Sequence, residues 1–312
     1  MSYYIGVDGG GTKTAFALFD EDKNVVETVT STGSNHENLE GAFDEASGII
    51  WDGICDLLKT AGKTLDDIGF TLMGLAGIDH PFQHDIMCEK LKAKGLKNFE
   101  IYNDGFIVVK AGSISGAAIG YNCGTGTCCN AIDSDGRMLQ LGGFSECSGD
   151  VGNGTWIAQT AFRLIYDEVY LGLEPTAITK MYYERFNIGS REEFLGSIAK
   201  LETEESPVYV QALISFFFAA AEAGDAPALR YVDVMAKRGA ELIAALAKQM
   251  NFAGDEVEVV LSGSMHTKLP NAVYLAKLAE NAEAFSGRKI KFIKLDKAPV
   301  TGCVNWIFQE YK

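Results

Sequence analysis

The chain has 312 residues, with 27 lysines and arginines against 42 aspartates and glutamates, for a formal net charge of −15. Hydrophobic residues make up 47% and charged residues 22%, a balance typical of a folded globular protein of about two domains. The acidic balance argues against a nucleic acid or an anionic membrane surface as partner, because both require a basic patch. An anionic ligand stays possible where backbone amides, a lysine and a metal ion act locally.

The numbers of glycines and cysteines and the lengths of the apolar runs narrow the class of protein further. The 34 glycines occur with only 6 prolines, which favours loops that turn sharply or approach a ligand over a flexible linker. The 7 cysteines lack the spacing of a disulfide scaffold, so we expect a reducing, cytoplasmic location. No apolar run reaches the ~18 residues of a transmembrane helix, and the strand-like start predicts no signal peptide.

Strand and helix patterns alternate along the amino-terminal third of the chain. The expected elements are, in chain order, three strands at 4–7, 15–19 and 25–29, a helix over 39–58, a strand at 70–73, a helix at 82–94, a strand at 99–102, and a helix after Asn103-Asp104-Gly105. Alternation of this kind predicts an α/β layer.

The second half of the chain repeats the opening pattern. Ile119-Gly120-Tyr121-Asn122-Cys123-Gly124 aligns with Ile5-Gly6-Val7-Asp8-Gly9-Gly10 at a constant offset (119 − 5 = 124 − 10 = 114). Leu295-Asp296 echoes Asn103-Asp104, since each pair is expected to close a strand and open a helix. Short matches arise by chance, but the shared order of elements favours a duplicated α/β domain. Residues 156–250 are nearly all helical in period, which predicts an insertion in the second copy.

Glycine-rich loops at equivalent places in the repeat are candidate phosphate-binding loops. The first reads Asp8-Gly9-Gly10-Gly11-Thr12-Lys13-Thr14: its amides can point at an anion, Lys13 adds a charge, and Asp8 can hold Mg²⁺ through water. It is not a Walker A loop, because Lys13 falls one place late and a strand follows. A tight hairpin with glycines at positive φ is the alternative. The second loop, Cys123-Gly124-Thr125-Gly126-Thr127, is weak alone, but two such loops could clamp one polyphosphate.

Four further places combine polar residues with glycine or a strand end. Gly263 follows an expected strand at 257–261 and could admit a nucleotide base or ribose, although a helix start with a serine cap explains it as well. Asp104 follows a strand, where open α/β sheets bind ligands, yet an N-cap aspartate is the alternative. Residues 31–36 form a polar elbow that reads as a turn plus helix cap. Residues 142–154 contain five glycines, more than a plain loop needs.

The ordered set of these motifs resembles one family. Asp8 to Thr14, Asn103-Asp104, Gly124 to Thr127, Gly142-Gly143 with Gly149-Asp150-Val151-Gly152, and Ser262-Gly263 look like the N-acetylglucosamine kinase branch of the BadF/BadG/BcrA/BcrD-type ATPases. This branch lies within the acetate kinase/sugar kinase/Hsp70/actin superfamily, and the resemblance covers essentially the whole chain. It implies an α/β fold of two ribonuclease-H-like (actin-like ATPase) domains with an ATP and sugar cleft between them. The implied domains are residues 1–115, joined by a C-terminal helix at about 299–312, and residues 116–298 with the helical insertion.

The resemblance also implies a function, an ATP- and Mg²⁺-dependent kinase acting on the 6-hydroxyl of an amino sugar. Asp104 would be the general base, and Asp8 would lie at the metal. The implied nucleotide contacts are Gly10, Gly11, Thr12, Lys13, Thr14, Gly124, Gly126, Thr127 and Gly263. The implied sugar contacts are Asn35, Asn103, Asp104, Thr125, Gly143, Asp150 and Gly154, while His36 would support its loop.

Departures from the family pattern leave the sugar open. Phe144 stands where the family usually has Trp, and Val151 replaces the glutamate of Asp-Glu-Gly, so N-acetylglucosamine, glucosamine and N-acetylmuramic acid all remain candidates. A reductive activator of 2-hydroxyacyl-CoA dehydratases and a non-catalytic sugar sensor are the alternative functions. Gly124 to Thr127 differs from the Gly-Gly-Gln-Asp of such activators. Because similar kinases are commonly dimers, we expect a homodimer.

Cysteine and histidine spacing predicts no transition-metal chemistry. Cys123, Cys128, Cys129 and Cys147 lack the paired spacing of structural zinc, and core packing or reactive thiols explain them better. The 4 histidines occur in no zinc-protease or deaminase motif, so we expect no catalytic transition metal.

Overall fold

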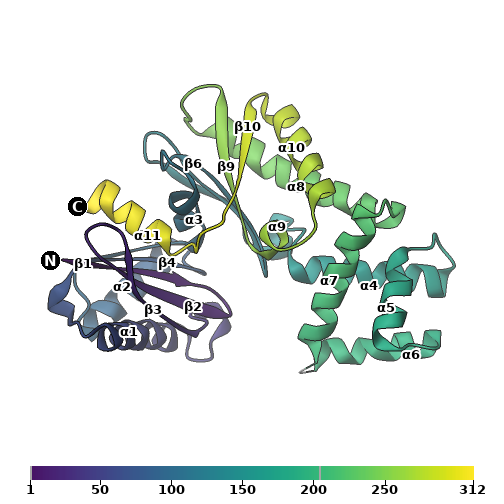
Figure 1. Ribbon diagram of the computed structural model, residues 1–312, viewed down its shortest axis with the longest axis horizontal. Helices are drawn as coiled ribbons and strands as arrows, with labels where there is room; N and C mark the ends of the chain where they lie inside the picture. The colour runs from purple at the N-terminus through teal and green to yellow at the C-terminus, as the bar shows by residue number, and fades with distance from the viewer. Residues whose placement is uncertain (1, 204) are drawn as a thin grey trace. The chain divides into compact units, whose positions relative to one another are not determined.

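A computed structural model describes residues 2–203 and 205–312 and contains two five-stranded sheets (Figure 1). The first sheet has the order β3-β2-β1-β4-β5 and the second β10-β9-β6-β7-β8. Their strands are β1 (Tyr3–Gly9), β2 (Lys13–Phe19), β3 (Val25–Thr32), β4 (Ile68–Leu75), β5 (Phe99–Tyr102), β6 (Ala118–Cys123), β7 (Thr127–Ile132), β8 (Met138–Gly142), β9 (Glu256–Ser262) and β10 (Lys289–Lys294). Read from β8, the second sheet repeats the first strand for strand, so the predicted duplication is confirmed.

Parallel pairing aligns three strand ends of the first sheet. β1 pairs antiparallel with β2 through a short hairpin, but it pairs parallel with β4, which pairs parallel with β5. The register sets Gly9 opposite Leu75, and Gly74 opposite Tyr102. The carboxyl ends of β1, β4 and β5 therefore share one edge, the edge at which open α/β sheets bind ligands.

By compactness the chain divides into two units. Unit 1 comprises Met1–Gly120, Asn130–Met138 and Leu295–Lys312, and unit 2 comprises Tyr121–Cys129 and Leu139–Lys294. The first sheet lies in unit 1, with the helices α1 (Ala42–Ala61), α2 (Pro81–Lys94), α3 (Asp104–Gly112) and α11 (Thr301–Trp306). The helix predicted over 39–58 is thus found three residues later, and Gly62 in the left-handed conformation (φ 63°) ends it.

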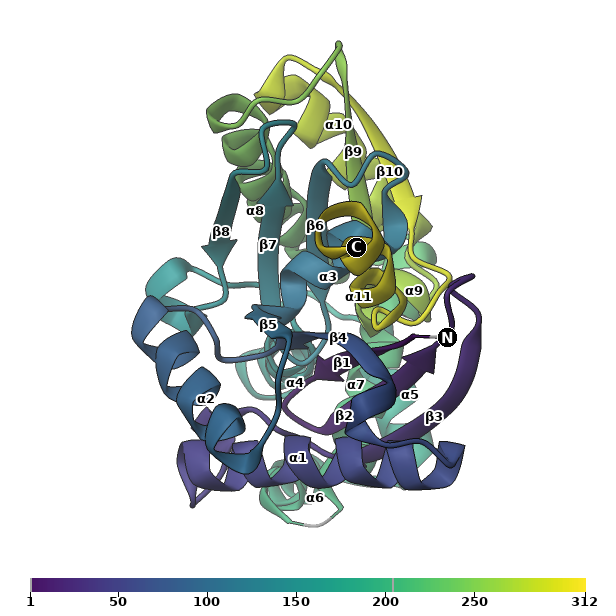
Figure 2. The same cartoon turned by 90° about the vertical axis from the view of Figure 1, so that its left-hand side faces the viewer.

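The two faces of the first sheet bury different helices. Alternate residues of β1 point to opposite faces, and Ile5 and Val7 belong to the core cluster shared with α1 and α2. On the other face Gly6 and Gly74 admit α11 and α3 closely, because a Cβ on Gly74 would lie 2.7 Å from Ile107. Figure 2 shows α1 and α3 on opposite sides of the first sheet.

Unit 2 holds most of the second sheet and the remaining helices. These are α4 (Gly154–Leu171), α5 (Ala177–Phe186), α6 (Arg191–Gly196), α7 (Ser206–Glu222), α8 (Ala226–Gln249), α9 (Ser264–Thr267) and α10 (Ala272–Ser286). α8 and α10 pack side by side against the sheet (Figures 1 and 2). The helices from α4 to α8 separate β8 from β9, which confirms the predicted helical insertion.

One predicted helix start is wrong. Leu295-Asp296 does follow β10, in the place that Asn103-Asp104 has after β5, but α11 begins only at Thr301. Pro299 explains the delay, because a proline lacks an N–H group and disfavours helical backbone at the residue before it.

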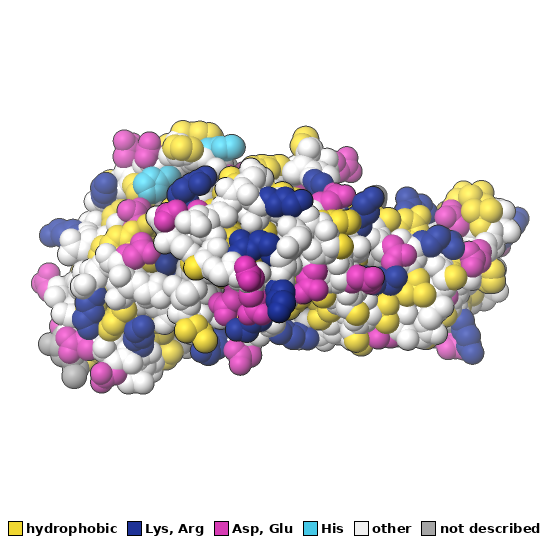
Figure 3. Space-filling view, turned by 90° about the horizontal axis from the view of Figure 1, so that it is seen from above, with side chains coloured by type: hydrophobic (Ala, Val, Ile, Leu, Met, Phe, Trp, Pro, Cys, Tyr) yellow, Lys and Arg dark blue, Asp and Glu magenta, His cyan; other side chains and the backbone are white. Residues whose placement is uncertain are grey.

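On the face of the molecule in Figure 3, acidic and basic side chains are interspersed. Among the described residues no single helix is long and apolar enough to cross a membrane. The pair α7 and α8, bent by 100°, passes that test only when its two helices are taken together.

Candidate active site

Three carboxylates gather at the shared edge of the first sheet. Asp8 lies at the end of β1, Asp79 in the loop after β4, and Asp104 directly after β5. Burial raises the pKa of Asp104 to about 7, and the charges of Asp8 and Asp79 act in the same direction. Burial also raises the pKa of Asp8 to about 6, against the opposing charge of Lys13. The site therefore favours a proton or a cation among its carboxylates.

Asn103, and not Asp104, caps helix α3. The Asn103 side chain accepts a hydrogen bond from Gly105 N (2.9 Å) and from Asn130 Nδ2 (3.2 Å), and it donates to Asp79 Oδ1 (2.9 Å). Gly105 must lack a side chain, because a Cβ there would lie 2.1 Å from Asn130 Oδ1. The capping alternative for Asp104 is thus wrong, and its partly exposed carboxylate stays available.

The loop between β1 and β2 is held by its backbone. Gly10 N donates to Lys13 O, and Ser34 N donates to Gly10 O, both at 3.0 Å. None of Gly9, Gly10 and Gly11 has positive φ, so they serve close packing rather than turn geometry. A Cβ on Gly9 would lie 2.5 Å from Ser34 Oγ, a buried hydroxyl without a hydrogen-bond partner among the described residues.

This loop leaves donors for an anion. The amides of Gly11 and Thr12 form no backbone hydrogen bond within the described part of the chain, and both residues are exposed, as is Lys13. Thr14 differs, because it is fully buried and its hydroxyl donates to Thr32 O at 2.8 Å. Thr14 therefore holds the hairpin together, and the loop's exposed donors are its amides and Lys13.

The polar elbow after β3 meets the loop after β4. Asn35 caps the short helix His36–Asn38 by accepting from Glu37 N (3.0 Å), as the cap alternative predicts. Its Oδ1 would lie 2.4 Å from a Cβ on Gly77, so the two loops touch. His36 is buried and stacks on Phe43 with ring centroids 3.8 Å apart, in keeping with a supporting role.

Three predicted glycines of unit 2 converge. Gly154 N donates to Gly124 O at 2.8 Å, and a Cβ on Gly124 would lie 3.8 Å from Gly263 Cα. Gly263 has φ 83°, and a Cβ on it would lie 2.2 Å from Cys123 O, so no larger residue fits. Gly263 itself occupies the cap position of α9, hence no serine caps that helix and this alternative is wrong.

The hairpin loop of unit 2 mirrors the one in unit 1. Thr125 and Gly126 are exposed at its tip, whereas Thr127 is buried and donates to Val151 O at 3.4 Å. Asn122, the counterpart of Asp8, accepts a hydrogen bond from Ser262 Oγ at 3.1 Å. This strand end carries an amide and a hydroxyl where the first sheet has carboxylates.

The glycine-rich segment 142–154 is shaped by its backbone. Gly142, Gly143, Gly149 and Gly152 all have positive φ, between 66° and 93°, which explains the choice of glycine. Asp150 accepts from Gly143 N (2.9 Å) and from Ser148 Oγ (2.8 Å), so its carboxylate organises the segment. Phe144 is exposed on the same segment.

Two residues of the site were absent from the sequence analysis. Asp79 follows an expected strand in Gly77-Ile78-Asp79, and the rule that ligands bind at carboxyl ends of strands would have found it. Asn130 gave no signal, because it lies within β7 and meets Asn103 only through tertiary structure.

The donor set of unit 1 fits a magnesium ion and a phosphate. Mg²⁺ prefers oxygen ligands and keeps several waters, which suits the partly exposed carboxylate Asp8 beside Asp104. Free amides next to a lysine suit phosphate oxygens. The arrangement can pair a carboxylate base with an activated phosphate.

Two sheets of identical strand order, with acidic strand ends on one and glycine loops on both, define an actin-like ATPase fold of two ribonuclease-H-like domains. The model of the BadF/BadG/BcrA/BcrD ATPase family matches residues 5–291. The chain belongs to this family.

Relatives and solved structures agree with the family. The chain is 25% identical over 235 residues to an N-acetyl-D-glucosamine kinase from Dictyostelium discoideum, covering 71% of this chain and 72% of the relative. It is 27% identical over 164 residues to an N-acetylmuramic acid/N-acetylglucosamine kinase from Clostridium acetobutylicum, covering 52% and 53%. The fold matches a crystal structure of a candidate N-acetylglucosamine kinase from Chromobacterium violaceum, with a TM-score of 0.69 and 19% identity over 97% and 98% of the two chains.

Proposed function

We propose that the protein is an ATP-dependent kinase that phosphorylates the 6-hydroxyl of an amino sugar, with N-acetylglucosamine as the first candidate. The observation that carries the proposal is the Asp104 carboxylate, whose pKa is raised to about 7 beside Asp8 and Asp79. A general base acts best when its pKa lies near the working pH. The two curated relatives, both named as amino-sugar kinases, support the substrate class.

Asp104 accepts the proton of the sugar hydroxyl in this proposal. Asn103 acts as a positioning residue, because its amide already bonds Gly105, Asn130 and Asp79. The proposed sugar contacts are Asn35, Thr125, Gly143, Asp150 and Gly154. Each carboxylate oxygen has more than one lone pair, so the Asp150 oxygens that accept from Gly143 N and Ser148 Oγ can also accept from a ring hydroxyl.

The glycine loops bind the nucleotide. We assign the phosphates to Gly10, Gly11, Thr12 and Lys13 in the first loop and to Gly124 and Gly126 in the second, with Gly263 beside the nucleoside. Asp8 would hold Mg²⁺, which when bound neutralises phosphate charge. Thr14 and Thr127 belong to the proposal only as supports of their loops, since both hydroxyls bond backbone carbonyls.

N-acetylmuramic acid is a second candidate substrate, favoured by Val151. Where the resembled kinases carry a glutamate beside the sugar-binding aspartate, this chain has valine, whose carbonyl accepts from Thr127. The anionic lactyl group of N-acetylmuramic acid would therefore be repelled by one carboxylate fewer here than in the resembled kinases. Glucosamine, which lacks both the acetyl and lactyl groups, is the third candidate.

An assay of ADP release, with ATP and Mg²⁺ present and one sugar added at a time, tests the proposal. The sugars are N-acetylglucosamine, N-acetylmuramic acid, glucosamine, N-acetylmannosamine and glucose, and the product of each active sugar is located by phosphorus–proton NMR. We expect turnover with an amino sugar and phosphate on its 6-oxygen. The proposal would be overturned if no sugar led to ADP release. It would also be overturned if ADP were released at the same rate with and without sugar, and that result would favour the reductive activator.

We further infer a cytoplasmic homodimer without nucleic acid or membrane partners. The net charge of −15 supports the absence of these polyanionic partners. Light scattering coupled to size-exclusion chromatography tests the assembly, and a monomer mass at micromolar concentration would contradict it.

A further inference from the structure

Unit 1 carries a second group of side chains, apart from the three carboxylates, with metal-binding chemistry. His84 and Cys88 lie one turn apart on the same side of α2, and Glu100 lies on β5. One ligand atom from each lies within 4.8 Å of the other two, and no other such group occurs among residues 2–203 and 205–312. The group draws together an imidazole, a thiol and a carboxylate from two elements.

The distances between the three side chains in the metal-free structure are close to those of a tetrahedral zinc site. His84 Nε2 lies 2.9 Å from Glu100 Oε1 and 3.5 Å from Cys88 Sγ. Zn–N bonds of about 2.0 Å and Zn–S bonds of about 2.3 Å place N and S about 3.5 Å apart in a tetrahedron. The His84–Glu100 distance is shorter, as expected when a proton rather than a metal joins the two groups.

A carboxylate behind the histidine completes the resemblance to a metal centre. His84 Nδ1 lies 3.2 Å from Asp85 Oδ1, so the ring nitrogen away from Glu100 already has its partner. Metal-binding histidines generally donate this second N–H to a carboxylate or carbonyl, which fixes the tautomer and ring orientation. In zinc-bound protein, Nε2 would then present its lone pair to the ion.

Charge balance suits a divalent cation here. Cys88 and Glu100 reach His84 from two different elements. The two charges of a divalent ion would balance those of one thiolate and one carboxylate.

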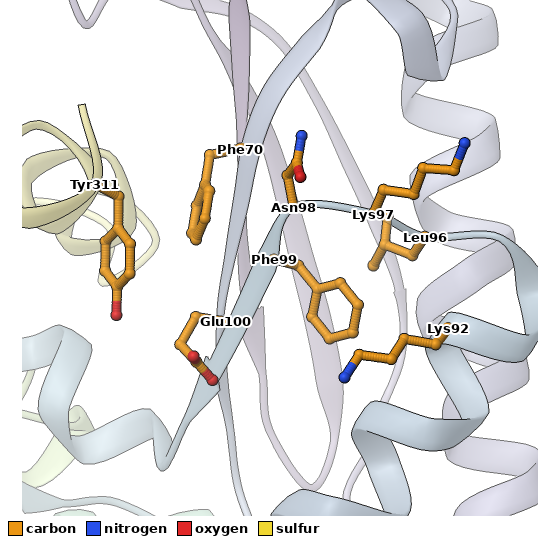
Figure 4. Close-up of a pocket in the computed structure, with 8 residues that line it drawn as sticks. All are labelled: Phe70, Lys92, Leu96, Lys97, Asn98, Phe99, Glu100 and Tyr311. Carbon is orange, nitrogen blue, oxygen red and sulfur yellow. The ribbon is translucent and has the colours of Figure 1, made fainter.

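Solvent reaches the group from one side. His84 and Glu100 are each about one third exposed, while Cys88 is nearly buried. Glu100 also lines a pocket of about 410 Å³ together with Phe70, Phe99 and Tyr311 (Figure 4). Three protein ligands and an open side leave room for a water as fourth ligand.

We propose that His84, Cys88 and Glu100 bind a zinc ion that joins α2 to β5. Thiolate and imidazole ligands select zinc over magnesium, so this site is chemically separate from the carboxylates of Asp8, Asp79 and Asp104. None of the three side chains belongs to the proposed sugar or nucleotide contacts, so the zinc ion would act apart from phosphoryl transfer. The expectation that no catalytic transition metal is present is untouched.

Zinc and cobalt binding to the full chain, stripped of metal with a chelator, tests the site. We expect one Zn²⁺ per chain by competition with a chromophoric chelator, a thiolate-to-cobalt absorption band with Co²⁺, and a zinc-dependent rise in Tm. Cys88→Ser and Glu100→Gln should each weaken zinc binding at least tenfold, and Cys88→Ser should abolish the band. Asp85→Asn should cost about 10- to 100-fold in affinity.

A matched control separates this site from adventitious binding. Cys147→Ser removes an exposed thiol outside α2 and β5, and it should change neither the affinity nor the band. Should the wild-type chain bind no zinc, or should Cys88→Ser bind it as tightly with the same cobalt spectrum, the proposal fails. Because the cobalt band of the wild-type protein requires a thiolate ligand, its absence also counts against the site even if a variant misfolds.

Discussion

The two sheets share one strand order but differ in the chemistry of their strand ends. In the first sheet Asp8 ends β1 and Asp104 follows β5; in the second, Asn122 takes the place of Asp8 in β6 and Asp296 follows β10. Asp104 has its pKa raised to about 7 by burial and neighbouring charges, whereas Asp296 is exposed. Duplication has preserved the scaffold while only one copy keeps a charged, crowded edge.

This division between the sheets fits the proposed binding of a phosphate by an acidic chain. Phosphate is best met by neutral backbone donors, and the Asn122–Ser262 pair keeps the second sheet's edge uncharged. In the proposed function carboxylates accept a proton and hold a metal ion, and the first sheet has carboxylates at its strand ends. Four substitutions test this division, in order of decreasing effect.

The largest effect is expected from Asp104→Asn. Loss of the proposed general base should lower the kcat of the sugar-dependent reaction by about 10²- to 10⁴-fold and leave ATP binding largely intact. Asp296→Asn, at the corresponding place after β10, is the matched control and should keep wild-type turnover. Coupled ADP-release kinetics and nucleotide titration measure the two variants. An equal loss of kcat in both variants, or no loss in Asp104→Asn, would contradict the proposed difference between the two sheets.

A second substitution places a carboxylate in the second sheet where the first sheet has one, and tests whether the strand end of β6 must be uncharged. Asn122→Asp gives β6 the carboxylate of β1 and keeps an oxygen for Ser262 Oγ, now 3.1 Å away. A carboxylate facing phosphate should raise the KM for ATP about tenfold, equivalent to about 1.4 kcal/mol. The KM for the sugar should change less. An unchanged KM for ATP would mean that the absence of charge at the strand ends of the second sheet does not matter for ATP binding.

Much of the fold was accessible from the sequence because it is locally encoded. Strand and helix periods located the elements around Gly9–Lys13 and Gly124–Thr127, and the repeat of Ile5-Gly6 in Ile119-Gly120 predicted the duplication. Element ends were less accessible, since α11 depends on Pro299 and α1 on the left-handed Gly62.

Side-chain roles at the site were harder to predict because they depend on distant neighbours. Sequence alone could not choose between a capping role and a catalytic role for Asp104. In the structure Asn103 caps α3 by accepting from Gly105 N, and its contacts with Asp79 and Asn130 hold it in place. The glycine-rich motif predicts Thr14 as a nucleotide contact, but strand alternation turns its hydroxyl inward, where it donates to Thr32 O. No zinc motif links Cys88 to Glu100, because α2 and β5 meet only in the folded unit.

The pH dependence of the reaction sharpens the account of the first sheet. In the proposed mechanism Asp104 must be ionised to accept a proton, so kcat/KM should rise with pH about a midpoint near 7. Asp79→Asn removes a negative charge that raises this pKa, and the midpoint should move to lower pH. Initial rates from about pH 5 to pH 9 measure both proteins, with Asp296→Asn as control. A midpoint that stays in place or moves upward would contradict the carboxylate cluster.

The smallest effect concerns the stability of the metal-free protein. The pKa of Asp8 rises from 3.8 to about 6 on folding, so the stability it contributes is complete below pH 3.8 and is lost as pH rises through 6. Asp8→Asn removes this loss and should stabilise the chain by about 1 kcal/mol at pH 8, a value reduced for partial exposure of the carboxylate. At about pH 5 the gain should be smaller, and Asp296→Asn should show no such trend. Urea unfolding without metal measures the three proteins. A destabilised Asp8→Asn variant at pH 8 would mean that burial does not disfavour the ionised Asp8 carboxylate, and the strand end of β1 would then differ from that of β6 in sequence but not in the cost of its charge.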